Sequence, residues 1–344
     1  MIRGVCVAIA IALLTGLPAV PQVSQSQMTP RLQELLKARQ FAEAEQIIRA
    51  QLTSSPDWET GHLLLAQIYT QAGKYDLAEQ SAAAAVRVRE SADGYMLLAL
   101  ATMRLTRLND SIGWLEKAAQ RYPDYAEIYR LLGLDYALGG ALREAETAFR
   151  KAVQLAPDSW EHYYFLGRTV FELGRVDEAL PVLQHAVRLN DASVKAWTAL
   201  GQVQERVGTD AAAEASYRKA VELCGDGPEC AWPLLQIGYR YSKQAKFSDA
   251  LPYFRRAVKV RPGWARTHFH LAKTMAELND LAGARTELEQ ATSLDGSKSE
   301  YHYQLAQIYR RLGDPRNADV EFARFRSMLQ GESYRAHSAE FAQP

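Results

Sequence analysis

The sequence is poor in cysteine, has no excess charge of either sign, and lacks the short motifs of the common enzyme classes. Its 344 residues include 3 cysteines, 40 basic residues and 40 acidic residues. A nucleic-acid-binding protein usually shows a basic excess or basic blocks, so the balanced charge argues against a nucleic-acid partner. No H-E-x-x-H, P-loop, G-x-S-x-G or G-x-G-x-x-G pattern occurs in it. We therefore expect no enzymatic activity, no metal site and no cofactor.

Long apolar runs are also scarce, and the one that stands out lies at the N-terminus. Arg3 is the one charged residue before Arg31, and an apolar run from Val5 to Leu17 leads to Ala19. A basic start, an apolar stretch of this length and a small residue near its end are typical of a secretory signal peptide. The run is shorter than the roughly 20 residues of a membrane span. We expect a signal peptide over about residues 1–19, inside a signal and polar leader at 1–27, with an uncleaved anchor as the alternative. The mature chain would then be exported, periplasmic or extracellular, without a membrane span.

A pattern with a period near 34 residues fills the rest of the chain. One copy contains Tyr129, Leu132, Gly133, Tyr136, Ala145, Phe149 and Pro157. The following copies contain Tyr163, Leu166, Gly167, Ala179 and Leu183, and then Trp197, Leu200, Gly201, Ala213 and Tyr217. Each copy holds two apolar-periodic stretches of about 12–14 residues, which predicts a pair of amphipathic helices. Because one helix pair cannot bury its apolar face alone, neighbouring pairs are expected to stack.

These positions resemble those of the tetratricopeptide repeat (TPR) family. The resemblance covers roughly residues 28–330 as about nine repeats, of which the first and the last are degenerate. It leaves residues 331–344 as a C-terminal tail, which is either a short capping helix or disordered. It implies an all-α TPR solenoid, a right-handed superhelix of antiparallel helix pairs. It also implies a non-enzymatic scaffold that binds a peptide or protein partner in its concave groove.

In TPR arrays, defined positions of the first helix of each repeat line the concave groove. The resemblance assigns to it Arg130, Leu134, Tyr164, Arg168, Phe171, Gln202, Arg206, Trp232, Tyr239, Phe269, Lys273 and Tyr303. This mixture of aromatic, basic and polar side chains suits a protein partner. Packing between neighbouring repeats is the alternative for each aromatic residue. The positions that clamp a terminal carboxylate in chaperone-binding TPR proteins contain no Asn here, which argues against that activity.

A second hypothesis is an accessory or carrier protein that binds a sugar, lipid or cofactor within the superhelix. Its stacking surfaces would come from four tryptophans: Trp160, Trp197, Trp232 and Trp264. The histidines do not favour a metal. His62, His268 and His302 share one repeat position that is often aromatic, so we expect them to pack between helices. His268 and His270 are two residues apart on a helix and point in different directions, unlike i, i+4 ligands.

The segment CGDGPEC, residues 224–230, interrupts the repeat. The period should end near Gly227, but the next copy begins near Ala231, so we expect an inserted loop of about three extra residues. Removal of the signal peptide would leave Cys224 and Cys230 as the two cysteines, and an oxidising compartment favours a disulfide. Two thiolates without companion ligands do not make a zinc site, and the spacing differs from a redox C-x-x-C. We therefore expect a Cys224–Cys230 disulfide at a junction between repeats.

Overall fold

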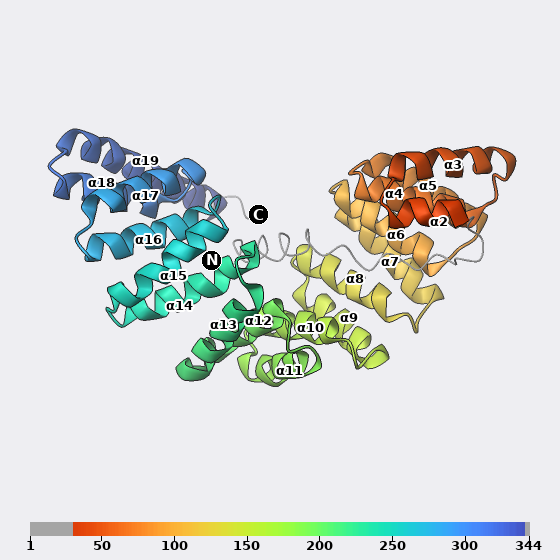
Figure 1. Cartoon of the computed structure of the whole chain (residues 1–344), viewed down its shortest axis with the longest axis horizontal. Coiled ribbons are helices and arrows are strands. Elements are labelled where there is room, and N and C mark those ends of the chain that lie inside the picture. The colour runs from red at the N-terminus through yellow and green to blue at the C-terminus, as the bar shows by residue number, and fades with distance from the viewer. Residues whose placement is uncertain (1–29, 341–344) are drawn as a thin grey trace. The chain divides into compact units, whose positions relative to one another are not determined.

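The computed structural model describes residues 30–340, with side chains through residue 329. The predicted signal peptide and leader, residues 1–27, and the end of the predicted tail, residues 341–344, lie outside the described residues. Within 30–340 the regular structure is entirely helical (Figure 1), which confirms the predicted all-α solenoid of helix pairs. The chain divides into two compact units, one ending at Leu189 and the other beginning at Asn190.

Unit 1 is a row of helix pairs, each made of a first and a second helix. The pairs are α2 (Pro30–Lys37) with α3 (Phe41–Ser54), α4 (Glu59–Gln71) with α5 (Tyr75–Val88), α6 (Ala92–Arg104) with α7 (Leu108–Arg121), α8 (Ala126–Leu138) with α9 (Leu142–Leu155), and α10 (Trp160–Glu172) with α11 (Val176–Leu189). The second helices α3, α5, α7 and α9 also pack on the first helix of the next pair, so the apolar faces within the unit form a continuous core.

Unit 2 repeats this arrangement with one interruption. Its pairs are α12 (Val194–Val207) with α13 (Asp210–Cys224), α14 (Ala231–Lys243) with α15 (Phe247–Val260), α16 (Ala265–Glu277) with α17 (Leu281–Leu294), and α18 (Ser299–Arg311) with α19 (Pro315–Glu340). A short 3-10 helix, η2 (Pro228–Cys230), lies between α13 and α14. The backbone of residues 331–340 continues α19.

Close packing within a pair depends on glycine in the first helix facing a large ring in the second. A Cβ atom built on Gly133 would lie 2.7 Å from the ring of Phe149, and one on Gly201 would lie 2.7 Å from the ring of Tyr217. Both rings are completely buried, at 1% and 0% exposure. The repeated glycine therefore sets how closely the two helices approach.

The turn inside each pair passes through a residue with positive φ. Gly140, Gly174 and Gly208 have φ between 80° and 85° and follow one another at intervals of 34 residues. The next such turn residue, Ala245, comes 37 residues after Gly208, which locates the three extra residues expected around 224–230. Thr106, at φ 62°, occupies the same turn position in the pair of α6 and α7.

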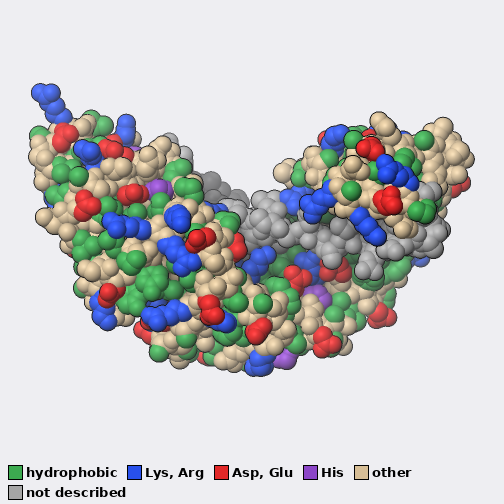
Figure 2. All heavy atoms as spheres, in the orientation of Figure 1, with side chains coloured by type: hydrophobic (Ala, Val, Ile, Leu, Met, Phe, Trp, Pro, Cys, Tyr) green, Lys and Arg blue, Asp and Glu red, His purple; other side chains and the backbone are tan. Residues whose placement is uncertain are grey.

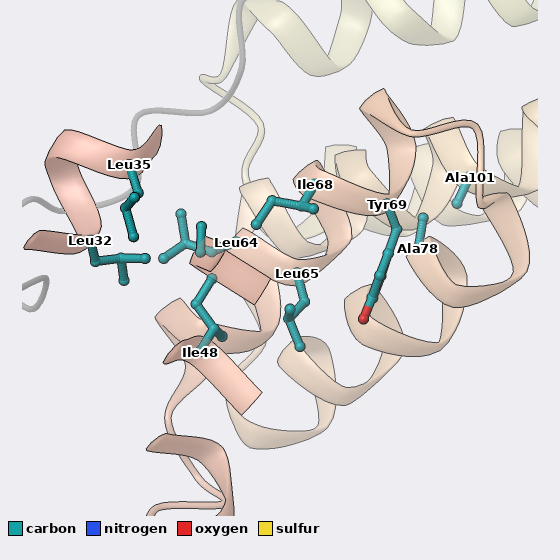
Figure 3. Packing of buried hydrophobic residues seen from close by; sticks show 10 residues of the cluster. Leu32, Leu35, Ile48, Leu64, Leu65, Ile68, Tyr69, Ala78 and Ala101 are labelled. Carbon is teal, nitrogen blue, oxygen red and sulfur yellow. The ribbon is translucent and has the colours of Figure 1, made fainter. Parts of the chain in front are cut away.

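The first repeat, predicted to be degenerate, has a short first helix but a complete core. α2 has 8 residues, whereas α4 has 13. Leu32 and Leu35 of α2 are at most 1% exposed, and they lie beside Ile48 of α3 and Leu64 of α4 (Figure 3). Burying a leucine side chain stabilises a fold by about 1.5–3 kcal/mol, so these two leucines help to hold this short helix against the neighbouring helices.

Candidate functional site

The first helices form one layer of each unit. In unit 1, α4 contacts α6, α6 contacts α8, and α8 contacts α10; in unit 2, α14 contacts α16 and α16 contacts α18. Among the described helices, successive second helices make no contacts of comparable extent. The first helices are therefore closer together, as on the inner side of a curved array. We call the exposed side of this layer the first-helix face of its unit, and it corresponds to the predicted groove.

In unit 1, the predicted groove residues are mostly interior. Arg130 and Leu134 on α8 and Tyr164 on α10 are buried, while Arg168 and Phe171 are half-buried. The guanidinium carbon of Arg130 lies 5.8 Å from the ring centroid of Phe165 on the next first helix, whereas Tyr164 packs against Trp160 and Phe165 of its own helix. The three buried side chains therefore present little accessible surface on this face.

The two arginines among these residues are neutralised within unit 1. Arg130 Nε donates to Glu127 Oε2 at 2.8 Å. Arg168 Nη2 donates to Glu172 Oε1 at 3.2 Å, and burial raises the pKa of this glutamate. Each cation therefore has a carboxylate on its own helix.

In unit 2, more of the predicted groove is accessible. Phe269 is buried, Gln202, Trp232 and Tyr303 are half-buried, and Arg206, Tyr239 and Lys273 are exposed. Figure 2 shows hydrophobic and basic side chains next to one another on the visible face of this unit, over α14 to α16.

The accessible cations of α14 and α16 lie against aromatic rings. Lys243 Nζ is 4.8 Å from the ring centroid of Tyr239, and Lys273 Nζ is 5.4 Å from that of Phe269. The guanidinium carbon of Arg266 is 5.4 Å from the ring centroid of Trp232. A cation over a ring face at such distances is attracted by the ring quadrupole, which holds the head group in place.

The two first-helix layers carry opposite charge. In unit 1, the first helices α2, α4, α6, α8 and α10 hold seven acidic and five basic residues: Glu34, Glu59, Asp93, Glu127, Asp135, Glu161 and Glu172 against Arg31, Lys37, Arg104, Arg130 and Arg168. In unit 2, helices α12, α14, α16 and α18 hold eight basic and three acidic residues: Lys195, Arg206, Arg240, Lys243, Arg266, Lys273, Arg310 and Arg311 against Glu205, Glu277 and Glu300. The zero net charge of the chain conceals this division.

His270 of α16 lies among aromatic rings and close to the cations of unit 2. Its ring lies 5.7 Å from that of Phe254 and 5.8 Å from that of Tyr239. Burial lowers the pKa of His270 to about 4, with Arg266 and Lys273 contributing in the same direction. At neutral pH this histidine is uncharged.

Sequence reasoning missed Lys243 and His270 as parts of this surface. Lys243 occupies the repeat position of Arg206, but the two are 37 residues apart because of the insertion. Adding the three inserted residues to the period of 34 predicts Lys243 from the position of Arg206. His270 follows Phe269 directly, and no periodic signal marks it.

The histidines at the shared repeat position pack between helices. Nε2 of His62, His268 and His302 each lies 2.8–3.1 Å from the carbonyl oxygen six residues earlier. On the other side of the ring, Nδ1 of His268 lies 2.6 Å from Glu287 Oε2, and Nδ1 of His302 lies 2.5 Å from Glu321 Oε2. The hydrogen bond that His268 donates to Glu287 raises the pKa of His268. These carboxylates on the second helices were not anticipated from the sequence.

Other candidate chemistry is limited in the part of the chain that the structure describes. These residues contain no group of three or more His, Cys, Asp or Glu side chains placed to hold a metal ion. Of the helices described, none combines the length and the apolar character needed to cross a bilayer. A shallow cleft of about 630 Å³ is lined by Thr292, Gly296, His302, Ala323, Arg324, Ser327 and Met328. None of the four tryptophans considered as stacking surfaces lines it.

The inserted loop is held by a disulfide between its first and last residues and by contacts with α15. Cys224 and Cys230 form a disulfide with Cα atoms 5.6 Å apart, and Cys230 is fully buried. Arg256 of α15 donates to the carbonyl oxygen of Gly225 and lies 3.4 Å from Asp226 Oδ1. The loop is therefore fixed to the following repeat as well as to itself.

Comparison with known proteins agrees with the repeat architecture. One tetratricopeptide repeat model matches residues 31–95, 63–126, 96–159, 130–193 and 164–228. Two further tetratricopeptide repeat models match residues 242–308 and 299–324.

Two curated proteins share part of the array. The inactive TPR repeat-containing thioredoxin TTL3 of Arabidopsis thaliana is 34% identical over 102 residues, which are 29% of this chain and 14% of that protein. Anaphase-promoting complex subunit 3 of Schizosaccharomyces pombe is 26% identical over 117 residues, 34% of this chain and 17% of that protein. The match therefore spans less than a fifth of either relative.

Among solved structures, the Cut9–Hcn1 hetero-tetramer of APC/C superposes with a TM-score of 0.56 at 16% identity, over 83% of this chain and 56% of that one. Pseudomonas aeruginosa PilF superposes with a TM-score of 0.55 at 16% identity, over 62% of this chain and 97% of that one. At such identity the similarity concerns the fold. Since one repeat model alone matches more than half of the residues, the chain belongs to the tetratricopeptide repeat family.

Proposed function

We propose that this protein is a non-enzymatic scaffold that binds a segment of a partner protein on the first-helix face of unit 2. One observation carries the proposal: Tyr239, Arg206 and Lys273 are exposed on neighbouring first helices, beside the half-buried Trp232. Aromatic residues and arginine are the side chains that most often dominate binding energy in protein interfaces. The corresponding residues of unit 1 are buried or half-buried, and both arginines among them are paired with a glutamate, so unit 2 is the better docking surface.

The test is site-specific photo-crosslinking in the native cell. A benzophenone amino acid replaces Tyr239 on the first-helix face or, as the matched control, the exposed Arg255 on α15. We expect a discrete protein adduct from position 239 and none from position 255. Equal labelling at both positions, or none at position 239, would contradict binding on this face.

We also propose that the chain works in an exported, periplasmic or extracellular space. The Cys224–Cys230 disulfide supports this, because disulfides persist in oxidising compartments and are rare where thiols are kept reduced. The intact mass of protein from the native cell, measured after thiol alkylation without a reductant, provides the test. Export predicts no alkylation at these two positions and loss of the N-terminal segment, whereas two alkylated thiols would contradict it.

A further inference from the structure

The cations on the first-helix face of unit 2 lack the partners that similar residues have in unit 1. No carboxylate among the described residues lies within 4 Å of the head group of Lys243 or Arg266. Lys273 Nζ has one carboxylate oxygen at 4.0 Å, Glu300 Oε1, and both side chains are about half exposed. An exposed ion pair of this kind contributes little. Three positive head groups are therefore available for a ligand.

The comparison with unit 1 indicates that the fold does not impose this arrangement. Arg130 and Arg168 occupy the same layer and the same side of their helices, yet each has a glutamate on its own helix. In unit 2, α14 contains no acidic residue at all, and the acidic residue of α16, Glu277, forms no ion pair with Arg266 or Lys273 among the described residues. The cations of unit 2 are instead held by aromatic rings, which position the charge without neutralising it.

The ring contacts decide which kind of acidic partner fits. Trp232 stacks on Trp264 with centroids 5.7 Å apart and also lies under Arg266. Phe269 packs against Tyr301 at 4.7 Å and also lies under Lys273. Single-stranded nucleic acids bind by stacking bases on free aromatic faces, and these faces are occupied. The accessible groups are the cationic head groups, which match carboxylates, and the exposed part of Tyr239, which offers apolar contact.

Resting on the binding function proposed above, we propose that unit 2 recognises an acidic segment of its partner, with Lys243, Arg266 and Lys273 binding its Asp and Glu side chains. Hydrophobic residues between the acidic ones contact Tyr239, which is 37% exposed. Carboxylate recognition by rim cations confers specificity and speeds association more than it adds affinity, so the binding is salt-dependent.

Fluorescence anisotropy with defined peptides tests this assignment on the full chain. The probe is a fluorescein-labelled 16-residue peptide of repeating Glu-Asp-Leu-Gly; matched peptides carry Gln and Asn, or Lys and Arg, in place of the acids. A labelled oligothymidylate of the same length serves as the nucleic-acid comparison. The variant K243Q/R266Q/K273Q removes the three charges. The variant R255Q/K259Q/R285Q removes three exposed charges from the second helices and is the matched control.

We expect the acidic peptide to bind at least about tenfold more tightly than its amide or basic counterparts, with affinity falling between 50 and 300 mM salt. The affinity for the acidic peptide should fall at least about tenfold in the triple variant on the first-helix face, and less than about twofold in the control variant. Equal binding of the amide peptide, tighter binding of the oligothymidylate, or equal losses in both variants would overturn the assignment. If the crosslink at position 239 forms but any of these results is found, the acidic specificity is wrong and the binding function stands. If no crosslink forms at position 239, the proposed binding function itself is wrong.

Discussion

Replacing Asp135 with asparagine tests how much an ionised carboxyl group destabilises the interior of unit 1. Asp135 lies on α8 and is 7% exposed, with Oδ2 2.5 Å from Ser111 Oγ of α7. Ser111 Oγ is also 2.8 Å from the carbonyl oxygen of Ala99 on α6. A serine hydroxyl has one proton to donate, and a carbonyl oxygen only accepts. If the serine donates to Ala99, the carboxyl group must supply the proton of the other hydrogen bond.

Burial raises the pKa of Asp135 to about 6, against a smaller opposing effect of the hydrogen bond with Ser111. From an ordinary value near 3.8, the shift is about 2 pKa units, and each unit corresponds to about 1.4 kcal/mol. A carboxyl group whose pKa is raised on folding stabilises the fold least when it is ionised. Its full contribution is present below about pH 4 and is lost as the pH rises through about 6. Above pH 7, ionised Asp135 therefore costs roughly 3 kcal/mol relative to its neutral form.

The amide side chain of the D135N variant would be neutral at every pH, and its N–H can donate to Ser111. We expect D135N to raise the free energy of unfolding at pH 7.5 by about 1–3 kcal/mol, with about half of this gain remaining at pH 5. Urea unfolding followed by circular dichroism at both pH values measures the difference. D124N, which removes the same charge from an exposed position, is the control and should change stability by less than about 0.5 kcal/mol. A D135N protein that is less stable at pH 7.5, or whose gain does not shrink at pH 5, would refute the reasoning.

Three further predictions concern the turn, the histidine pair and the loop. Thr106 has φ 62°, which suits glycine, so T106G should raise the unfolding free energy by ~0.5–1 kcal/mol in urea titrations; a loss of stability would count against strain at this turn. Because Glu287 raises the pKa of His268, their hydrogen bond stabilises the fold fully below about pH 6.5 and less as the pH rises through the folded pKa. E287Q should therefore cost about 1–2 kcal/mol at pH 6 and less at pH 8.5, and an equal cost at both would contradict this. Replacing Cys224 and Cys230 by serine should lower stability by about 2 kcal/mol in tryptophan-monitored urea unfolding, and an unchanged midpoint would show that the loop needs no crosslink.

The repeat pattern predicted the helix pairs well because it reflects contacts that recur within each repeat. Gly133 faces Phe149 and Gly201 faces Tyr217 at the same spacing, so the period alone identifies both helices. The insertion near residues 224–230 was also readable, because three extra residues shift every later position of the repeat. The short first repeat was harder to predict, because α2 has only 8 residues and depends on two leucines for its packing.

The groove residues were harder to predict because their exposure depends on the neighbouring repeat. Arg130 and Phe269 are buried and each contacts a ring on the next first helix, Phe165 and Tyr301 respectively. Tyr164 is buried against rings of its own helix. Lys243 and His270 become part of the surface through their contacts with Tyr239, a residue that belongs to one repeat while His270 belongs to the next.

The sequence by itself determined the helical repeat, its period, its interruption and the two cysteines that flank it, because these follow from local spacing along the chain. The tertiary structure decided which side chains of the first helices reach solvent and which charges remain unpaired. It also brought Ser111, Asp135 and Ala99 from three helices to one buried point. Such contacts join residues from different repeats, and their outcome depends on the particular side chains of both neighbours, which no repeating pattern encodes.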